Sequence, residues 1–196
     1  ATCLRVRAPR TAAPEGRVVP RGDDQIYRID HYDAMPPFLV SLTSPTNHWV
    51  FLSTTGGITA GRRNADHAIF PYTTSDRVAD SASTTGAVTV VLVDHEGGRL
   101  RWEPFNREYD GIYEVRRSVE KNITGNVITF EEHNVDLALT FRQTWTTSPR
   151  YGIVRECALL ATGAGERRVT VLDGVRNTLP ALTTAAFQGA FSNLLD

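Results

Sequence analysis

Asp136-Leu137-Ala138-Leu139-Thr140-Phe141-Arg142-Gln143-Thr144-Trp145 is the stretch that decides the fold of this chain. Large apolar side chains share one face of it (Leu137, Leu139, Phe141 and Trp145), and polar side chains take the other (Asp136, Thr140, Arg142 and Thr144). Because successive side chains of a strand point to opposite faces, this period of two predicts a half-buried antiparallel β-strand.

The same period recurs along most of the chain. Further strands are predicted at 25–31, 38–42, 48–53, 88–93, 99–103, 111–120, 127–131, 151–161 and 167–173. The turn residues from Asp94 to Gly98 predict a hairpin, and a turn at 177–180 leads into a short C-terminal helix over 184–191. About ten short strands separated by turn signals predict a mainly β fold, a large antiparallel two-sheet sandwich.

Composition narrows the classes of function. The 196 residues, 41% hydrophobic and 22% charged, fit one globular domain. Lys+Arg 21 against Asp+Glu 22 leaves a formal charge of -1, so no basic excess favours nucleic acid or an anionic membrane as partner. No run approaches the roughly 18 apolar residues of a membrane span. With only Cys3 and Cys157, far apart, we expect reduced thiols and a cytoplasmic protein.

A second stretch, Phe51 to Tyr72, gathers the groups that a polyhydroxylated or anionic ligand needs. The predicted substrate-binding residues are Trp49, Arg62, Arg63, Asn64, Asp66, His67 and Tyr72. Arginine forks bind phosphate or vicinal hydroxyls, a carboxylate accepts hydrogen bonds from hydroxyls, and aromatic rings stack on a pyranose face. The structural alternative is a turn at 64–66, with arginines that are solvated or pair with Asp66.

Three segments carry a resemblance to a known family. Trp49–Arg62, Ala68–Tyr72 and Asp173–Pro180 resemble the N-terminal β-sandwich region of glycoside phosphorylases and hydrolases related to cellobiose phosphorylase. The resemblance implies a galactose-mutarotase-like supersandwich, which we place at 25–196 and expect to be truncated at its C-terminal end. Residues 1–24 are expected to be a tail or loop, because the stretch from Thr11 to Gly16 is a poor core former. In that family a helical linker and an (α/α)6 barrel follow, and the barrel holds the catalytic acid and the phosphate site.

The resemblance also implies what the chain does and does not do. Neither catalytic residues, nor a metal, nor a cofactor are expected within it, and inorganic phosphate would be a co-substrate of a parent phosphorylase. The implied partners are a carbohydrate, the missing helical barrel and a second copy in a homodimer. The chain would support carbohydrate binding and domain packing, and we expect it to be a fragment that is inactive alone.

Two other classes of function stay open. A mutarotase-like epimerase would need a histidine acid, for which His31, His48, His67 and His133 are available. A stand-alone binding module would stack a tryptophan on glycan, and here Trp102 is expected to be exposed whereas Trp145 belongs to the core. Glu131 and Glu132 lie on opposite faces of one strand and are interpreted as solvated strand ends.

Overall fold

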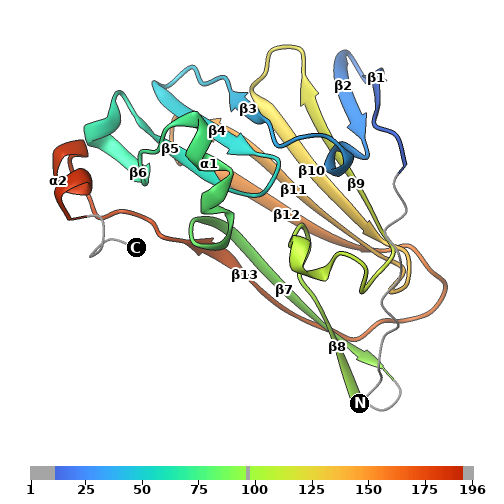
Figure 1. The fold of residues 1–196 in the computed structure, drawn as a ribbon. Coiled ribbons are helices and arrows are strands. Elements are labelled where there is room, and N and C mark those ends of the chain that lie inside the picture. Colours follow the sequence, from blue (N-terminus) through green and yellow to red (C-terminus); the bar gives the residue numbers. More distant parts are fainter. Residues whose placement is uncertain (1–11, 96–97, 192–196) are drawn as a thin grey trace.

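A computed structural model of the protein describes residues 12–95 and 98–191. One layer is a six-stranded antiparallel sheet in the order β1-β2-β9-β10-β11-β12 (Figure 1). Its strands are β1 (Glu15–Arg21), β2 (Asp24–Asp30), β9 (Val115–Asn122), β10 (Val127–Asn134), β11 (Leu139–Ser148) and β12 (Gly152–Ala161). Leu139 to Trp145 of the stretch that decides the fold lie in β11, next to one edge of this layer, whereas Asp136 to Ala138 belong to the turn before it.

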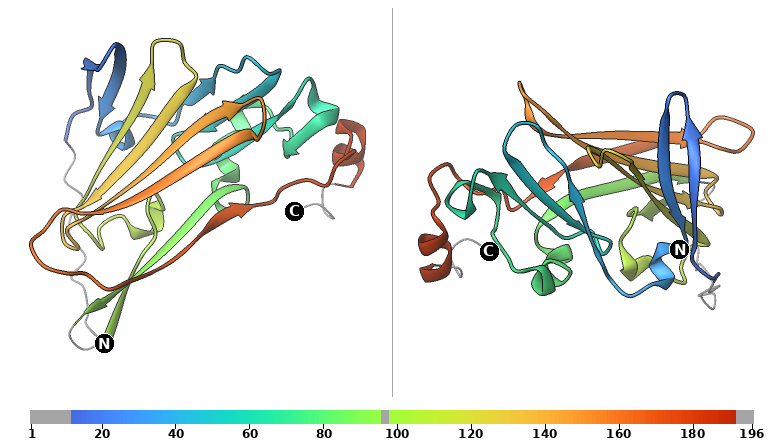
Figure 2. Two further views of the ribbon diagram at one scale, coloured as in Figure 1. Left: turned by 180° about the vertical axis from the view of Figure 1, so that it is seen from behind. Right: turned by 90° about the horizontal axis from the view of Figure 1, so that it is seen from above.

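Two smaller antiparallel sheets form the opposing layer (Figure 2). The four-stranded sheet contains, in order, β3 (Leu39–Leu42), β4 (His48–Ser53), β5 (Ile58–Arg62) and β6 (Ala68–Phe70). The three-stranded sheet contains β13 (Val169–Arg176), β7 (Gly86–His95) and β8 (Gly98–Trp102). The predicted mainly β, antiparallel sandwich is confirmed, with one layer divided in two.

Helix is confined to short segments between strands and at the C-terminal end. The α-helices are α1 (Ser75–Val78) and α2 (Ala185–Ala190), and the 3-10 turns are η1 (Tyr32–Ala34), η2 (Ala65–His67), η3 (Asp80–Ser83) and η4 (Arg107–Tyr109). The Thr184 hydroxyl accepts a hydrogen bond from the Phe187 N–H at 3.1 Å, which caps α2. The predicted C-terminal helix is thus confirmed.

Two apolar clusters fill the space between the layers. The first joins the four-stranded sheet, through residues such as Val50, Leu52 and Ile58, to Ile128 and Trp145 of the large sheet. The second joins the three-stranded sheet to the other half of the large sheet, with Val91, Val93, Trp102, Leu139 and Phe141 among its buried members. Each small sheet therefore has its own core, and the large sheet holds both in place.

A buried carboxylate lies on the inner face of β10. Glu132 is 1% exposed, and it accepts hydrogen bonds from Trp102 Nε1 at 2.7 Å and from the Phe105 N–H at 2.8 Å. Arg117 of β9, itself buried, donates to the same carboxylate from Nε at 2.7 Å and pairs with Asp110 at 2.8 Å. These bonds connect both layers, because Trp102 ends β8 of the three-stranded sheet.

This network corrects two expectations from the sequence. Glu131 and Glu132 do face opposite sides of β10, but neither is a solvated strand end. Glu131 is partly buried and bound by Arg28 and Arg142, and three donors compensate the burial of Glu132. Trp102 was expected to be exposed, yet it is fully buried with its indole N–H bound to Glu132. Trp145 is in the core, as predicted.

Three strands were not anticipated. The expected tail or loop at 1–24 contains β1, whose residues pair with β2 from Glu15–Asp30 to Arg21–Asp24. β5 and β6 fall where the sequence suggested loop, and the register shifts between Ala60 and Gly61 where β6 pairs with β5. Residues 1–11, 96–97 and 192–196, which include Cys3, the tip of the predicted hairpin and the last residues of the expected C-terminal end, lie outside the described residues.

We predict that Arg117→Met lowers the free energy of unfolding by about 3–5 kcal/mol, because it leaves the Glu132 carboxylate buried without its counter-charge. Urea denaturation measures the change. Arg99→Met is the matched control, since Arg99 forms an ion pair with Asp94 at the surface, 61% exposed, and its loss should change the midpoint little. Equal losses in the two variants would contradict the central role of the buried network.

Candidate functional site

A cleft of about 500 Å³ opens beside β6, between the α1–η3 segment and α2. Figure 1 shows α2 beside β6 at one end of the molecule, and α1 further in, near β4 and β5. Its lining residues are Pro71, Tyr72, Thr73, Arg77, Asp80, Ser81, Thr84, Thr85, Leu179, Ala185, Gln188 and Gly189. The size is that of small-molecule sites in general.

The cleft is rich in hydroxyl groups and contains one aromatic ring. Thr85 is buried in its wall, where its hydroxyl accepts from Asn177 Nδ2 at 3.0 Å, and Tyr72 is 54% exposed. The Thr73 hydroxyl is buried and has no hydrogen-bond partner. Within the described part of the chain, neither Arg77 nor Asp80 has an ion pair, so both charges are available to a ligand.

Glycines after β4 set the position of one wall. Gly56 adopts a φ of +103°, in the left-handed region that favours glycine. A Cβ atom on Gly57 would stand 1.9 Å from the Val78 carbonyl oxygen, so α1 can lie against this turn only because residue 57 has no side chain. The Thr55 hydroxyl donates to the Ala79 carbonyl at 2.8 Å and fastens the same segment. The Gly56-Gly57 pair thus shapes the cleft.

The opposite wall, α2, is attached to the loop around β6 by two side chains. Asp66 Oδ1 accepts from the Ala185 N–H at 2.9 Å, and Gln188 Oε1 accepts from the Tyr72 N–H at 2.9 Å. Gln188 Nε2 also donates to the Thr183 carbonyl at 3.0 Å. Asp66, a predicted ligand-binding residue, is therefore engaged in holding a helix.

The remaining predicted residues occupy different places. Trp49 meets Tyr72 edge to face, with ring centroids 5.7 Å apart, and lies so close to Gly61 that a Cβ there would be 2.4 Å from the indole. His67 and Asn64 hydrogen-bond to each other at 2.7 Å. The structure thus brings Tyr72 to the cleft with Trp49 behind it, while Arg62, Arg63, Asn64 and His67 are not among the lining residues.

Arg62 has a neighbour that the sequence did not suggest. It is opposite His48 in the β4–β5 register, and burial together with the positive charge of Arg62 lowers the pKa of His48. His48 also hydrogen-bonds to Thr46 at 2.8 Å. Arg62 and Arg63 are exposed, and among the described ion pairs they have none with Asp66, so their role in ligand binding stays a prediction.

Sequence reasoning missed most of the residues that line the cleft. Arg77, Asp80, Ser81, Thr84 and Thr85 all lie between β6 and β7, in a segment dense in Ser, Thr and Asp. That composition signals turns as often as it signals binding. These hydroxyls come together because α1 packs against Gly57. No sequence pattern shows that contact.

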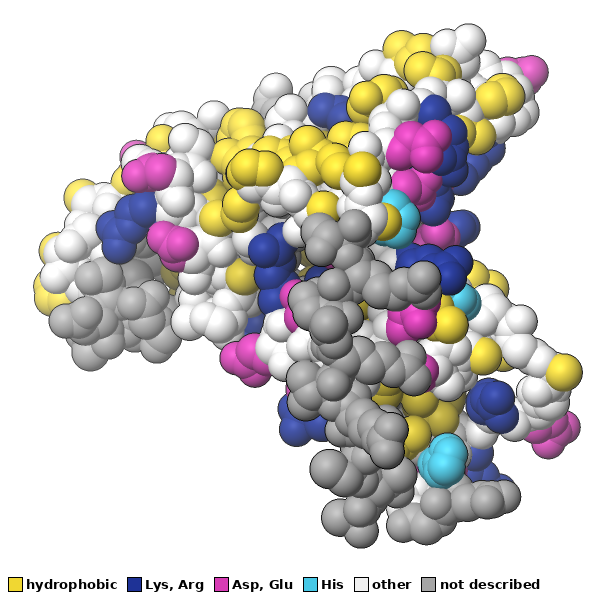
Figure 3. Space-filling view, turned by 45° about the vertical axis from the view of Figure 1, so that its right-hand side comes forward, with side chains coloured by type: hydrophobic (Ala, Val, Ile, Leu, Met, Phe, Trp, Pro, Cys, Tyr) yellow, Lys and Arg dark blue, Asp and Glu magenta, His cyan; other side chains and the backbone are white. Residues whose placement is uncertain are grey.

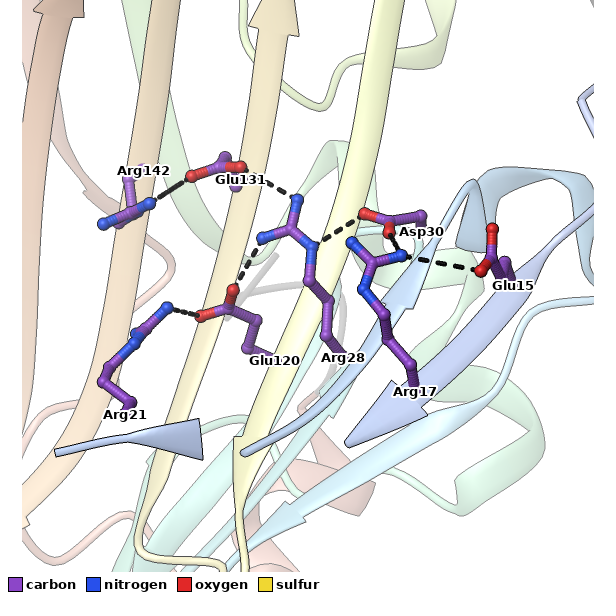
Figure 4. Close-up of polar contacts among 8 residues, drawn as sticks. All are labelled: Glu15, Arg17, Arg21, Arg28, Asp30, Glu120, Glu131 and Arg142. Atoms are coloured by element: carbon purple, nitrogen blue, oxygen red, sulfur yellow. Dashed lines mark hydrogen bonds and ion pairs between the residues drawn. The ribbon is translucent and has the colours of Figure 1, made fainter. Parts of the chain in front are cut away.

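Charged side chains gather on the outer face of the large sheet. Figure 3 shows acidic and basic side chains side by side on one face of the molecule. In Figure 4, Arg28 is placed among three carboxylates: it binds Asp30 at 2.7 Å, Glu120 at 2.6 Å and Glu131 at 3.1 Å. Arg142 binds Glu131 from Nε at 3.0 Å. The groups neutralise one another, so this face reads as a structural network.

Arg142 and Arg28 control the ionisation of Glu131. Its partial burial alone would raise the pKa of the carboxyl group. Hydrogen bonds from the two guanidinium groups outweigh the burial and hold the pKa of Glu131 below its usual value of 4.5. The carboxylate therefore stays ionised and adds stability at neutral pH.

The comparisons with known proteins identify no relative: no family model matches the chain, and no curated protein matches it. Across residues 12–95 and 98–191, no three His, Cys, Asp or Glu side chains gather in a group that could hold a metal ion. No helix of these residues is long and apolar enough to cross a membrane.

We predict that Gly57→Ala displaces α1 and lowers the free energy of unfolding by about 1–3 kcal/mol, because the new methyl group meets the Val78 carbonyl. Denaturant unfolding measures the loss. Gly189→Ala is the control, since a Cβ at that position meets no atom within 4 Å. A Gly57→Ala protein as stable as wild type would show that α1 is not held against this turn.

The Glu131 network predicts a pH dependence. A carboxyl group whose folded pKa is depressed stabilises the fold above its unfolded pKa and loses that contribution as pH falls through the folded value. The stability difference between wild type and Glu131→Gln should therefore be full above pH 4.5 and shrink as pH falls below it. Unfolding curves from pH 7 to about pH 3 test this. In an Arg142→Met background the dependence should weaken, and an unchanged one would contradict the assigned cause.

Proposed function

We propose that this chain is a non-catalytic β-sandwich that binds carbohydrate in the cleft between α1–η3 and α2. The observation that carries the proposal is the lining itself: one exposed aromatic ring, Tyr72, stands beside the hydroxyl groups of Thr73, Ser81, Thr84 and Thr85. A sugar offers a C–H face to an aromatic ring and a fringe of hydroxyls to polar groups, so this combination fits it.

The two unpaired charges strengthen the case. Arg77 presents a planar fork of donors, which suits vicinal hydroxyls, and the Asp80 carboxylate accepts hydrogen bonds from two hydroxyls at once. Gln188 adds an amide that both donates and accepts, although part of it is already used to hold α2. A neutral polyol can satisfy both charges without bringing a counter-ion.

We assign binding, and not bond cleavage, to this cleft. Glycoside hydrolysis uses two carboxyl groups on either side of the scissile bond, and the described lining offers one, Asp80. The sequence resemblance to cellobiose-phosphorylase-related enzymes supports a parent protein in which a helical barrel supplies the catalytic acid and binds phosphate. In that parent the sandwich would hold the outer part of a glycan and pack against the barrel.

Isothermal titration with glucose and cellobiose tests the proposal. We expect saturable binding to wild type, and a loss of about tenfold or more in Tyr72→Ala and in Asp80→Asn, equivalent to about 1.4 kcal/mol or more. Tyr151→Ala is the matched control, because Tyr151 is also exposed, at 69%, and does not line the cleft. Its affinity should equal that of wild type.

Two outcomes would contradict the assignment. One is the absence of saturable binding for any mono- or disaccharide tested up to solubility. The other is an equal loss in Tyr72→Ala and Tyr151→Ala, which would place the sugar elsewhere. Melting temperatures of all three variants show whether a lost affinity reflects a lost fold.

A further inference from the structure

A second hollow lies at the other edge of the four-stranded sheet. β3 is the last strand of that sheet, whereas the large sheet continues past it through β9, β2 and β1. Among the described residues, a groove of about 260 Å³ lies at this edge. Its lining residues are Tyr27, Ile29, Phe38, Leu39, Val40, Ser41, Val119, Glu120 and Lys121.

The walls of this groove are mainly apolar. Val119 and Val40 are buried members of the core, and Ile29 and Phe38 pack against it. Tyr27 is 51% exposed, and its ring lies against β1, where a Cβ on Gly16 would be 2.3 Å from the phenol oxygen. The groove is larger than the apolar cavity of about 150 Å³ that is known to bind benzene.

One positively charged side chain, Lys121, lies at the end of the groove. Lys121, the single lysine of the chain, is on the same face of β9 as Val119 and is opposite Tyr27 in the β2–β9 register. No carboxylate of the described residues lies within ion-pair distance of it. A Cβ on Gly125 would stand 3.0 Å from its Cε and 3.5 Å from its Nζ, so the tight turn at Gly125 confines the end of the side chain.

The neighbouring acid does not neutralise this lysine. Glu120 is on the opposite face of β9, where its two oxygens bind Arg28 and Arg21 at 2.6 Å and 2.9 Å. The groove therefore combines apolar walls with one uncompensated positive charge. A ligand that matches both needs an apolar body and one anionic group.

We propose that this groove binds a small apolar carboxylate, with its ring or chain between β2 and β3 and its carboxylate on Lys121. A β-strand fits less well, because the groove borders only Phe38 to Ser41 of β3, and strands commonly run about 5–6 residues. The site is separate from the cleft beside β6, and it does not depend on the sugar-binding proposal.

Fluorescence titration with 2-naphthoate tests the site, and the neutral 2-naphthylmethanol is the matched probe. We expect naphthoate to bind wild type at one saturable site and to lose about tenfold or more in affinity in Lys121→Met, because the ion pair is gone. The neutral probe should bind both proteins equally. Lys121→Arg keeps the charge and should restore part of the naphthoate affinity.

Arg63→Met is the control for general charge effects, because it removes one positive charge outside the groove and should leave naphthoate binding unchanged. If Lys121→Met lowers the melting temperature, Lys121→Gln provides the same loss of charge. Equal naphthoate affinities in wild type and the Lys121 variants, or no saturable binding to folded wild type, would overturn the proposal. So would sedimentation showing that the probe binds by dissociating a dimer, since the groove would then be an interface between copies.

Discussion

The fold depends on one buried carboxylate, Glu132, and on the donors that surround it. An uncompensated charge in the core costs several kcal/mol, so the carboxylate requires the Arg117 guanidinium and the Trp102 indole together. Trp102 comes from the three-stranded sheet, and Arg117 from the large one. The hydrogen bonds from Trp102 and Arg117 to Glu132 have a defined geometry, and they therefore fix how the two layers pack on each other. Apolar contacts alone would specify that packing less strictly.

Glycine positions then decide what the loops can present. Gly57 admits α1 against the end of β4, and Gly61 admits the Trp49 ring over β5. Neither position tolerates a Cβ atom. The α1 backbone can therefore approach Gly57 closely, and the Trp49 indole can approach Gly61. Because Trp49 contacts Tyr72, and Tyr72 contacts Gln188 of α2, the packing over β5 extends into the wall of the cleft. The site is shaped by small residues, whereas its chemistry belongs to the hydroxyls.

The sequence predicted the sandwich because a period of two leaves a strong signal wherever one face is buried, as in β11 and β4. The alternation is absent where neither face of a strand is buried. β1 is exposed on both faces, and its hydrogen-bonded pairing with β2 is what makes it a strand. The sequence also misleads for Glu132, because its charge suggests solvent while its partners are distant in the chain. Tyr72 was among the predicted binding residues because it belongs to the aromatic and charged stretch from Phe51 to Tyr72. Arg77 and Asp80 were not, because their segment reads as turns and only the packing of α1 brings them to the cleft.

The cleft beside β6 and the groove beside β3 both lie where the four-stranded sheet ends. At the β6 edge the chain covers the sheet with short helical segments, whose polar side chains and backbone turns make a hydroxyl-rich cleft. At the β3 edge the described residues leave a groove on the inner face of β2 and β9, which is lined by apolar side chains and one lysine. The four-stranded sheet is narrower than the large sheet that it packs on, so a hollow lies at each of its edges. The two hollows are lined by different kinds of side chain, hydroxyl-bearing at β6 and mainly apolar at β3. The two proposed ligand classes, a neutral polyol and an apolar anion, follow from that difference.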